Sequence, residues 1–404
     1  MVEKVGGFFT PKKNRDDQVR REISVLFGRR TLIFILVFVV LAVLFDILSD
    51  GIFISPRNLS LLLRQGAILA VLAGGVAMLI IMAEIDLSIG SAVFLCGLVA
   101  AQLTVEGNLP LLAVVLLTVL AGMTIGVIQG LWVVWLGIPS FVATLAGLLA
   151  YRGIGLLWTD ASAVGPVPAE FIALSESFLS KPLSAALLSA VFLAAVVAIF
   201  LGLRRLRQSS QLRTNAPLPG GQAATWVLAK VVAVALPLAL ITWIILGFEG
   251  MPMALIWVGG VVAVLIFVMN RTVFGRNAFL AGSSRESALY AGINVKKTVF
   301  AGFVIMGALY GVAGVLMTAR LGNSTPGLGT FLELDAIAAA VIGGVSLRGG
   351  AGSIVGAVMG AFLLTTINNG MSILNVPSFA QLVIKAIILL LALYFDAQVS
   401  KSRR

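Results

Sequence analysis

The sequence predicts an all-α, polytopic membrane protein of about twelve transmembrane helices arranged as an inverted internal repeat. Three observations predict this fold class: the composition, the spacing of long apolar segments, and motifs that recur in the two halves of the chain. Of the 404 residues, 60% are hydrophobic and only 11% are charged, and the mean hydropathy is +1.09. A water-soluble domain could not bury that much apolar surface, so the lipid bilayer is the expected solvent.

Apolar segments long enough to cross a bilayer follow one another along most of the chain. Eleven are predicted, at residues 31–48, 60–83, 88–105, 110–136, 140–158, 183–203, 224–247, 250–269, 297–320, 351–367 and 378–395. A twelfth, 335–345, is shorter. The glycines around it favour a tight turn, with a re-entrant hairpin as the alternative. One segment is therefore expected to be short or re-entrant.

The positive charges favour one orientation of these segments. The formal net charge is +11, and 21 of the 28 Lys and Arg residues fall in five places. These are residues 1–30, 204–213, 271–297, Arg348 and 401–404. Twelve crossings with both termini in the cytoplasm put all five places on the cytoplasmic side, as the positive-inside rule requires. Topology therefore explains the surplus charge, and a nucleic-acid partner is not expected.

The chain is predicted to be one membrane domain with two short tails. Residues 1–30 form a cytoplasmic N-terminal tail, 31–397 a single transmembrane domain, and 398–404 a cytoplasmic C-terminal tail. The first apolar run resembles a signal peptide, but it is too long and no small-x-small cleavage site follows, so we expect it to remain as the first membrane helix. The mainly acidic loop 160–182 is expected on the outer side.

Two pairs of motifs recur in the same order in the two halves. AEIDLSIGS at 83–91 is echoed by LELDAIAAA at 332–340, and IQGLWVVWLGIPSF at 128–141 by INNGMSILNVPSF at 367–379. The predicted topology puts each first copy inside and each second copy outside, as an inverted repeat requires. Coincidence in an apolar sequence is the alternative. Two pairs in one order favour the repeat, and inverted repeats place the translocation path between their halves.

Between Arg271 and Lys297 the chain carries an unusually polar stretch, RTVFGRNAFLAGSSRESALYAGINVKK. A membrane protein has little need for so many polar residues there unless a partner binds them. The middle of the stretch, SSRESALYAG, predicts a short helix with Ser283 or Ser284 as its N-cap and Gly292 at its end.

The spacing of Glu286, Ala288 and Gly292 resembles the E-A-A-x-x-x-G pattern of the cytoplasmic loop by which ABC-transporter permeases bind their ATPase, although Ser287 replaces one Ala. The helix would then dock in a groove of the ATPase. The predicted coupling residues are Ser284, Arg285, Glu286, Leu289, Tyr290 and Gly292. A solvated loop whose cations only fix the topology is the alternative. We prefer coupling because topology alone needs no amphipathic helix.

Longer stretches resemble one family over about residues 31–397. EIDLSIGS, IPSFVATLAG, GRNAFLAGSSRESALYAGINV, ELDAIAAAVIGGVSLRGGAGSIVGAVMGA and NNGMSILNVPSFAQLVIKAIILLLAL are similar to permeases of bacterial ABC importers for monosaccharides, the ribose/xylose group. An additional hydrophobic pair surrounds the basic loop 204–213. Ribose-type members lack this pair and xylose permeases are similar in having it, so the resemblance implies D-xylose as the cargo.

The resemblance also implies partners. The permease would be a homodimer in the bacterial inner membrane, driven by a cytoplasmic ABC ATPase and supplied by a periplasmic sugar-binding protein. The sequence contains no G-x-x-x-x-G-K-[ST] motif and no Gly-Lys pair, so ATP and Mg are expected to bind the ATPase, and this chain no cofactor. It has no histidine and a single cysteine, Cys96, and we find no nucleophile–base pair or metal cluster, so no enzyme is expected.

Polar residues next to or within apolar segments are the candidates for the translocation path. They are Glu84, Asp86, Gln129, Glu333, Asp335, Asn368 and Asn369. Acids in a membrane are functional candidates by default, but each acidic pair also precedes a predicted helix, and we prefer a structural role as a cap or as support for a broken helix. The three amides suit sugar hydroxyls and interhelical contacts equally well. Single charges at Asp46, Arg64, Arg152, Lys230 and Lys385 are expected to pair or to snorkel.

Two alternatives remain. An ion-coupled secondary transporter would suit inverted repeats and intramembrane acids, but it has no partner to bind the 271–297 stretch. An importer of the same superfamily for another sugar, a nucleoside, autoinducer or branched-chain amino acids is the second alternative, because the sequence shows no substrate pocket that can be recognised.

Overall fold

The computed structural model describes residues 29–107, 109–193, 197 and 242–401. Residues 1–28 of the predicted tail 1–30, the basic loop 204–213, Lys230 and most of segment 224–247 therefore lie outside the described residues. The chain divides into two compact units, Met1–Val40 with Pro182–Trp243, and Leu41–Lys181 with Ile244–Arg404. All the candidate residues except Lys230 lie in the second unit, which is described below.

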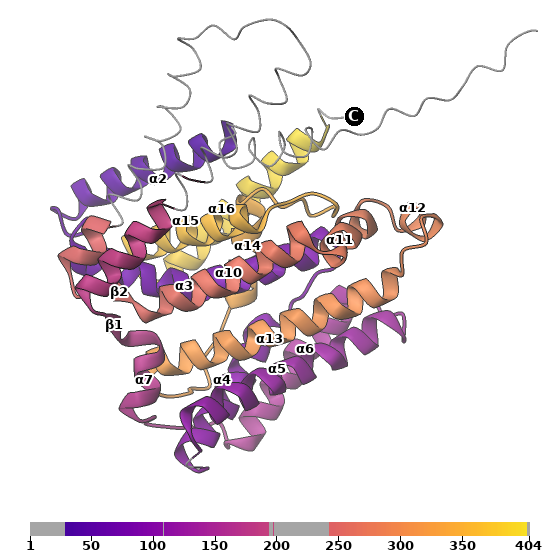
Figure 1. The fold of residues 1–404 in the computed structure, drawn as a ribbon, viewed down its shortest axis with the longest axis horizontal. Coiled ribbons are helices and arrows are strands. Elements are labelled where there is room, and N and C mark those ends of the chain that lie inside the picture. The colour runs from indigo at the N-terminus through magenta and orange to yellow at the C-terminus, as the bar shows by residue number, and fades with distance from the viewer. Residues whose placement is uncertain (1–28, 108, 194–196, 198–241, 402–404) are drawn as a thin grey trace, which may run out of the picture. The chain divides into compact units, whose positions relative to one another are not determined.

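The described chain is almost entirely helical (Figure 1). The helices are α2 (Arg29–Leu48), α3 (Pro56–Ile81), α4 (Ile89–Val105), α5 (Leu111–Val134), α6 (Ser140–Trp158), α7 (Ala169–Glu176), α10 (Met253–Arg271), α11 (Val273–Ser283), α12 (Arg285–Tyr290), α13 (Val295–Leu321), α14 (Leu332–Ile342), α15 (Ile354–Ile373) and α16 (Ser378–Lys401). Two strands of two residues, β1 (Phe178–Leu179) and β2 (Met251–Pro252), pair in antiparallel fashion.

Six of these helices are long and apolar enough to cross a membrane: α3, α5, α6, α10, α13 and α15. Shorter apolar helices lie at Leu36–Leu48, Ile89–Val105, Lys181–Leu193 and Ser378–Leu391. Where the structure describes them, the predicted segments other than 335–345 fall on these helices, which confirms a polytopic all-α membrane protein. The number of twelve crossings stays a prediction, because residues 198–241 are not described.

Two segments predicted as loops contain helices. The outer loop 160–182 holds α7, which begins directly after Pro168, and β1. The polar stretch 271–297 holds the whole of α11 in addition to the predicted short helix. The buried residues of α11 are Gly275, Ala278, Ala281 and Gly282. Residues this small give little hydropathy signal, although their spacing of three or four is that of one helix face.

The order and packing of the helices agree with the predicted inverted repeat. In each half, a helix of 26 or 27 residues (α3, α13) leads through a non-helical segment into a shorter helix (α4, α14), and two further helices follow. The long helix α13 packs against α5 and α4, and α3 packs against the equivalent α15 and α14. The long helix of each half thus packs against helices of the other half, as a two-fold relation between repeats would produce.

A non-helical segment precedes each short helix, and we name these the first break (residues 82–88) and the second break (residues 322–331). At 11 residues, α14 is only about 16 Å long, roughly half the hydrocarbon thickness of a bilayer. The predicted segment 335–345 therefore does not cross the membrane alone. Together with the second break it joins the end of α13 to Gly350, which hydrogen-bonds to the end of α3.

The second break meets the first turn of α4, which directly follows the first break, at Gly329 and Gly90. A Cβ atom added to either glycine would collide with the backbone carbonyl of the other. Only glycine allows two backbones to approach this closely. The short helices α4 and α14 consequently begin close to one another, one from each half of the repeat.

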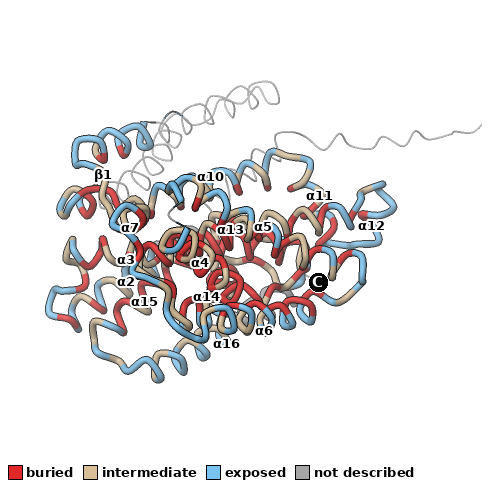
Figure 2. The backbone as a smooth tube through the Cα atoms, turned by 90° about the horizontal axis from the view of Figure 1, so that it is seen from below, coloured by how far each residue is buried: buried red, intermediate tan, exposed pale blue. Residues whose placement is uncertain are grey.

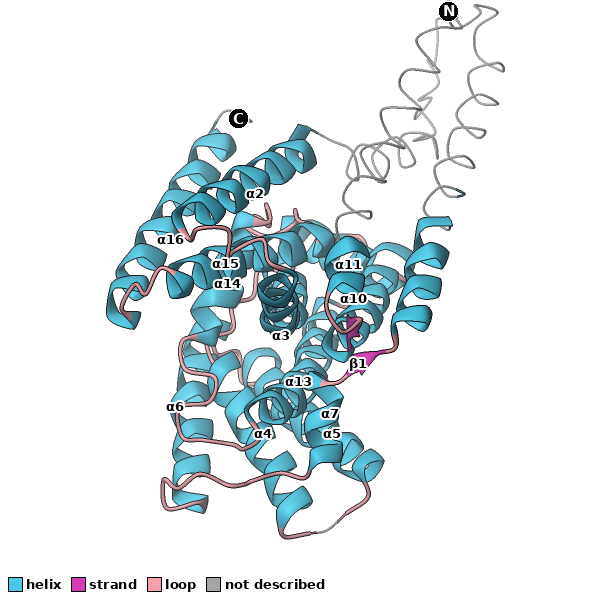
Figure 3. Cartoon of the chain, turned by 90° about the vertical axis from the view of Figure 1, so that its left-hand side faces the viewer, coloured by secondary structure: helices cyan, strands magenta, loops and turns pink. Residues whose placement is uncertain are grey.

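The long helices form the core (Figures 2 and 3). In Figure 3, α3 is seen end-on among α10, α13, α14 and α15, which all pack against it. The most apolar stretch of α3 is 89% buried and that of α13 67%, against 28% for α5 and α6 and 22% for α10. The exposed apolar faces of α5, α6 and α10 are suited to contact with lipid.

Candidate coupling segment and intramembrane polar residues

The predicted coupling segment folds as two helices joined at Ser284. The backbone of Ser284 is extended between α11 and α12. Its hydroxyl oxygen accepts a hydrogen bond from the backbone N–H of Ser287 at 3.2 Å, so Ser284, and not Ser283, is the N-cap. Gly292 follows with φ at +74°, the left-handed conformation that ends helices. The predicted short helix is confirmed, and its coupling role stays a prediction.

The helix α12 has two different faces. Ala288 is buried against the rest of the protein, whereas Leu289 and Tyr290 are 62% and 85% exposed. Glu286 is also exposed, and its carboxylate accepts a hydrogen bond from the Tyr290 hydroxyl at 3.5 Å. In Figure 1, α11 and α12 lie at one end of the long helices, and α7 and β1 lie at the other. The outward face of α12 is an apolar tip that another protein could cover.

Arg285 connects α12 to the permease. Its guanidinium donates to the carboxylate of Glu84 in an ion pair. The Glu84 side chain is only 3% exposed, and that of Arg285 is 56% exposed. Glu84 lies beyond the last turn of α3. Two sites predicted separately from the sequence, the coupling segment and the first acidic pair, are therefore in direct contact.

The junction between α11 and α12 also touches the end of the second half. Gly282 lies against the backbone of Ile81, the last residue of α3, and against Gly350, which follows α14. The N–H of Gly350 donates to the carbonyl of Ile81 at 2.8 Å. The junction is therefore in contact with the segments that follow α3 and α14 at the same end of the protein.

Asp86 lies in a buried polar cluster with Ser88, Gln129 and Tyr310, none of which is more than 2% exposed. Its carboxylate accepts from the backbone N–H and the hydroxyl of Ser88, both at 2.8 Å, and from the hydroxyl of Tyr310. The Gln129 amide donates to Ser88 Oγ. Ser88 is the N-cap residue of α4 but makes no side-chain capping bond. Asp86 therefore holds the cap residue in place and does not cap α4 directly.

The first break obtains its backbone partners from α6. Ser140 Oγ accepts from the N–H of Ile85 at 3.1 Å, and Thr144 Oγ1 accepts from the N–H of Leu87 at 3.0 Å. Non-helical backbone at membrane depth is tolerated only where the protein satisfies its polar groups. These two side chains meet that requirement for the first break.

The second break is also held by α6, two turns further along. Arg152 donates to the carbonyl oxygens of Pro326 and Leu328 at 2.8 and 2.9 Å. Its guanidinium lies 4.7 Å from the centre of the Phe94 ring, a cation–π contact. One helix thus supplies hydrogen-bond partners to both breaks.

The second acidic pair has partners of a different kind. The carboxylate of Glu333 accepts from the backbone N–H of Gly90, in the first turn of α4. It thereby places a negative charge at a helix N-terminus of the other half, where the helix dipole favours it. Asp335 forms an ion pair with Lys385 of α16, with 2.9 Å between Oδ2 and Nζ. These contacts support the structural role preferred for the acids.

The amides divide between the two roles left open by the sequence. Asn369 and Asn58 exchange two hydrogen bonds, of 2.9 and 3.0 Å, and so join α15 to α3. Gln129 belongs to the Asp86 cluster. Asn368 differs from both, because its Oδ1 atom is buried without a hydrogen-bond partner among the described residues. Interhelical contact is therefore favoured for Gln129 and Asn369, and Asn368 is the amide that remains available for substrate.

The single charges that the structure describes also have partners. Arg64 of α3 forms an ion pair with Glu176 of α7. The carboxylate of Asp46 accepts from the N–H of Ile54 at 2.9 Å. With Arg152 on carbonyl oxygens and Lys385 on Asp335, the expectation of pairing within the bundle is confirmed for these four residues.

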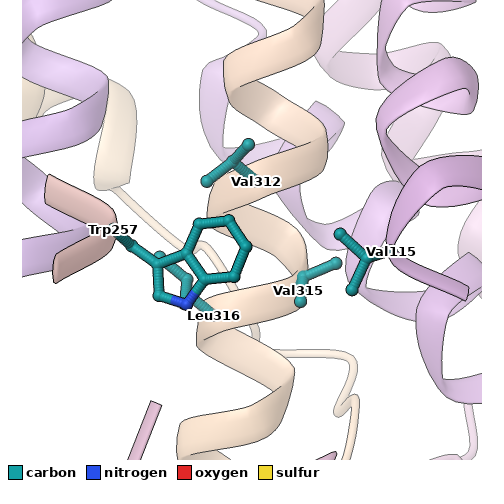
Figure 4. Close-up of a pocket in the computed structure, with 5 residues that line it drawn as sticks. All are labelled: Val115, Trp257, Val312, Val315 and Leu316. Carbon is teal, nitrogen blue, oxygen red and sulfur yellow. The ribbon is translucent and has the colours of Figure 1, made fainter. Parts of the chain in front are cut away.

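A recess of about 10 Å³ between α5, α10 and α13 is too small for a sugar (Figure 4). Its lining residues are Val115, Trp257, Val312, Val315 and Leu316. The indole N–H of Trp257, the one polar side-chain group among them, already donates to the carbonyl of Leu174 at 3.2 Å. Sugar hydroxyls need hydrogen-bonding partners, and this recess offers none.

Four residues that complete these sites were not singled out from the sequence: Asn58, Ser140, Thr144 and Tyr310. Each is a polar side chain in an apolar helix, which is a usable signal. Their partners, however, lie between 55 and 311 residues away in sequence. No local spacing reveals such pairs.

Comparison with known proteins adds independent information. Residues 58–393 match the family described as "Branched-chain amino acid transport system / permease component". The chain is 38% identical over 372 residues to the xylose transport system permease protein of Escherichia coli K12, covering 90% of this chain and 91% of that protein. It is 31% identical over 395 residues to the D-allose transport system permease protein of the same organism, covering 98% and 100%. It is also 31% identical over 361 residues to the ribose import permease protein of Bacillus subtilis, covering 89% and 91%. No solved structure matches the chain.

Proposed function

Because this chain belongs to the family of transport-system permease components, which includes the sugar permeases it is similar to, we propose that it is the membrane subunit of an ATP-driven monosaccharide importer. The proposed cargo is D-xylose. The chain would provide the passage through the membrane, and separate proteins would hydrolyse ATP and deliver the sugar.

The geometry of α12 carries this proposal. A six-residue helix with an exposed Leu289–Tyr290 tip has the size and chemistry to fill a groove on a partner protein. Arg285 of the same helix forms an ion pair with Glu84 of the first break. A helix that served only to fix topology would need neither the exposed tip nor the internal ion pair.

The choice of xylose rests on similarity. The xylose permease of Haemophilus influenzae is 37% identical to this chain over 375 residues, which cover 91% of this chain and 96% of that protein. The allose and ribose permeases are less similar, at about 30% identity. Another monosaccharide is the second candidate cargo, since these relatives share nearly the whole length of the chain. Asn368 is the one buried amide without a described partner, and it would be available to either kind of sugar.

The remaining parts of the proposal concern assembly. We place the protein in the bacterial inner membrane as a homodimer with both termini in the cytoplasm. Each copy would bind one ABC ATPase subunit through α12 on the cytoplasmic side and receive sugar from a periplasmic binding protein on the α7 side. ATP and Mg would bind to the ATPase, and this chain would bind no cofactor and catalyse no reaction.

Reconstitution in liposomes with the cognate ATPase and binding protein tests the proposal. Uptake of radiolabelled D-xylose should require ATP, stop with vanadate and persist with a proton uncoupler. Uptake that instead follows an ion gradient and ignores vanadate would establish the secondary-transporter alternative. A panel of xylose, ribose, allose and galactose in the same assay decides the cargo, because the preferred sugar should compete most strongly.

Docking through α12 has its own test. Leu289→Asp and Tyr290→Ala should each release the ATPase from the purified complex, since they remove the exposed apolar tip. Glu249→Ala is the matched control, because Glu249 is exposed near β2, at the other end of the helices. Co-purification of the ATPase with Leu289→Asp at the level of the control would remove α12 as the docking element.

A further inference from the structure

The helix α12 combines an exposed apolar tip with a contact to the permease. Leu289 and Tyr290 are exposed, and Arg285, itself 56% exposed, pairs with the buried Glu84. Binding of an ATPase to the tip can affect the membrane region only through such contacts between α12 and the permease. The ion pair of Arg285 with Glu84 is one of them.

We infer that the Arg285–Glu84 ion pair is the element that passes movement of α12 to the first break, and through it to α4 and the Asp86 cluster. Arg285 and Glu84 are positioning residues in this scheme, because neither is placed on the sugar or on ATP. The inference rests on the proposed function, since it needs an ATPase that moves α12.

The surroundings of Glu84 support this role. Its carboxylate is almost fully buried, and the break that carries it runs in five residues to the first turn of α4. The next residue, Ile85, is hydrogen-bonded to Ser140 of α6. Asp86, two residues after Glu84, is bonded to Tyr310 of α13. A displacement of Glu84 is therefore a displacement of a segment that contacts α4, α6 and α13.

The equivalent acid in the other half makes the connection specific to the first break. Glu333 bonds to Gly90 of α4, inside the bundle, and Asp335 bonds to Lys385 of α16. In the described part of the chain, Arg285 is the residue of α12 that forms an ion pair with either acidic pair. The repeat thus supplies two similar acidic motifs, and the ion pair links α12 to the first of them.

The test compares the number of sugar molecules imported per ATP hydrolysed in the complete transporter in liposomes. Arg285→Glu should lower this ratio about tenfold while the ATPase still co-purifies, because like charges then separate α12 from the break. The exchanged pair Arg285→Glu with Glu84→Arg should recover the ratio to within about threefold of the wild type, as expected for a direct pairwise interaction. Arg285→Gln gives an intermediate loss and serves if an exchanged charge prevents folding.

Lys296→Glu is the matched control, since Lys296 is an exposed cation a few residues beyond α12 and should leave the ratio at the wild-type value. A wild-type ratio in both Arg285→Glu and Arg285→Gln overturns the inference. It is also overturned if the exchanged pair accumulates, binds the ATPase and imports no better than Arg285→Glu. A purely structural pair would lower the yield of folded protein and leave the ratio unchanged. If the wild type shows no ATP-driven uptake at all, the proposed function fails, and if Leu289→Asp retains the ATPase, α12 is not the docking element. Both results differ from failure of the ion pair alone.

Discussion

The first break and the second break lead into related short helices, yet different partners hold them. The first break is mostly buried, with Glu84 and Asp86 at 2% exposure each. The second break is partly open: Phe331 at its end and Leu334 in the first turn of α14 are 47% and 46% exposed. In the first break one acid bonds to α12, whereas Glu333 and Asp335, in the first turn of α14, bond to other membrane helices.

The different partners of the two acidic motifs show that an internal repeat can keep its helices while the function of a motif changes. The E-x-D motif of the second half joins the two halves through Glu333 and Gly90, and joins α14 to α16 through Asp335 and Lys385. The E-x-D motif of the first half is connected to α12 by Arg285. In the proposed importer, the first break would respond to the ATPase, and the second would serve as its fixed counterpart.

The largest loss of stability is expected where the start of α4 meets the second break. Gly90→Ala places a methyl group against the carbonyl of Gly329 and the carboxylate of Glu333, so it should destabilise the permease by about 3 kcal/mol. The thermal midpoint of the detergent-solubilised protein measures this. Gly153→Ala is the control, because a Cβ atom there meets no atom within 4 Å. Equal midpoints for the two variants would show that α4 and the second break do not meet as described.

A second effect should be confined to the first break. Tyr310→Phe removes the hydroxyl that donates to the buried carboxylate of Asp86, and it should cost about 2 kcal/mol of stability. Tyr290→Phe is the matched control, since that hydroxyl is on the surface and makes only a long contact with Glu286. A midpoint for Tyr310→Phe equal to that of the control would mean that the Asp86 cluster contributes nothing to the fold.

A smaller effect is expected at the contact of α3 with α15. Asn369→Leu leaves Asn58 with its bond to the Phe53 carbonyl but without its partner amide, at a cost of about 1 kcal/mol. Asn58→Leu and the double variant complete a cycle that isolates the pair. A coupling energy of zero in that cycle would assign Asn369 to another contact, such as one with the sugar.

The smallest loss of stability is expected next to the second break, at the ion pair between α14 and α16. Lys385→Met removes the ion pair with Asp335, whose two side chains are 24% and 19% exposed, so water screens the charges in part. We expect a loss below about 1 kcal/mol. A loss as large as that of Tyr310→Phe would contradict the view that the second break is held less strongly than the first.

Much of the helix pattern could be predicted from the sequence, because long apolar runs record burial in a membrane directly. The predicted segment 140–158 has the bounds of α6, and the N-cap of α12 is Ser284, one of the two serines that the sequence indicates. The sequence does not predict α11, because its buried face is made of Gly and Ala, which carry little hydropathy. It predicts segment 335–345 as a crossing, because hydropathy does not distinguish a half-helix from a short full one.

The candidate residues show the same limit. Local spacing identified the two acidic pairs and the coupling segment, and the repeated motifs related the two halves. Local spacing could not show that Arg285 and Glu84 are in contact, because 201 residues separate them. The contacts of Asp86 and Glu333 support the structural role expected for the acids, which is to stabilise broken helices. Glu84 also forms the ion pair with Arg285.

The most direct test of the difference between the breaks is a parallel measurement on Glu84→Gln and Glu333→Gln. Glu84→Gln removes the charge that pairs with Arg285, so it should lower the sugar imported per ATP while the ATPase stays bound. Glu333→Gln should keep the wild-type ratio, because Glu333 bonds to Gly90 of α4 and not to α12. A loss of the ratio in Glu333→Gln with the ratio retained in Glu84→Gln would contradict the account.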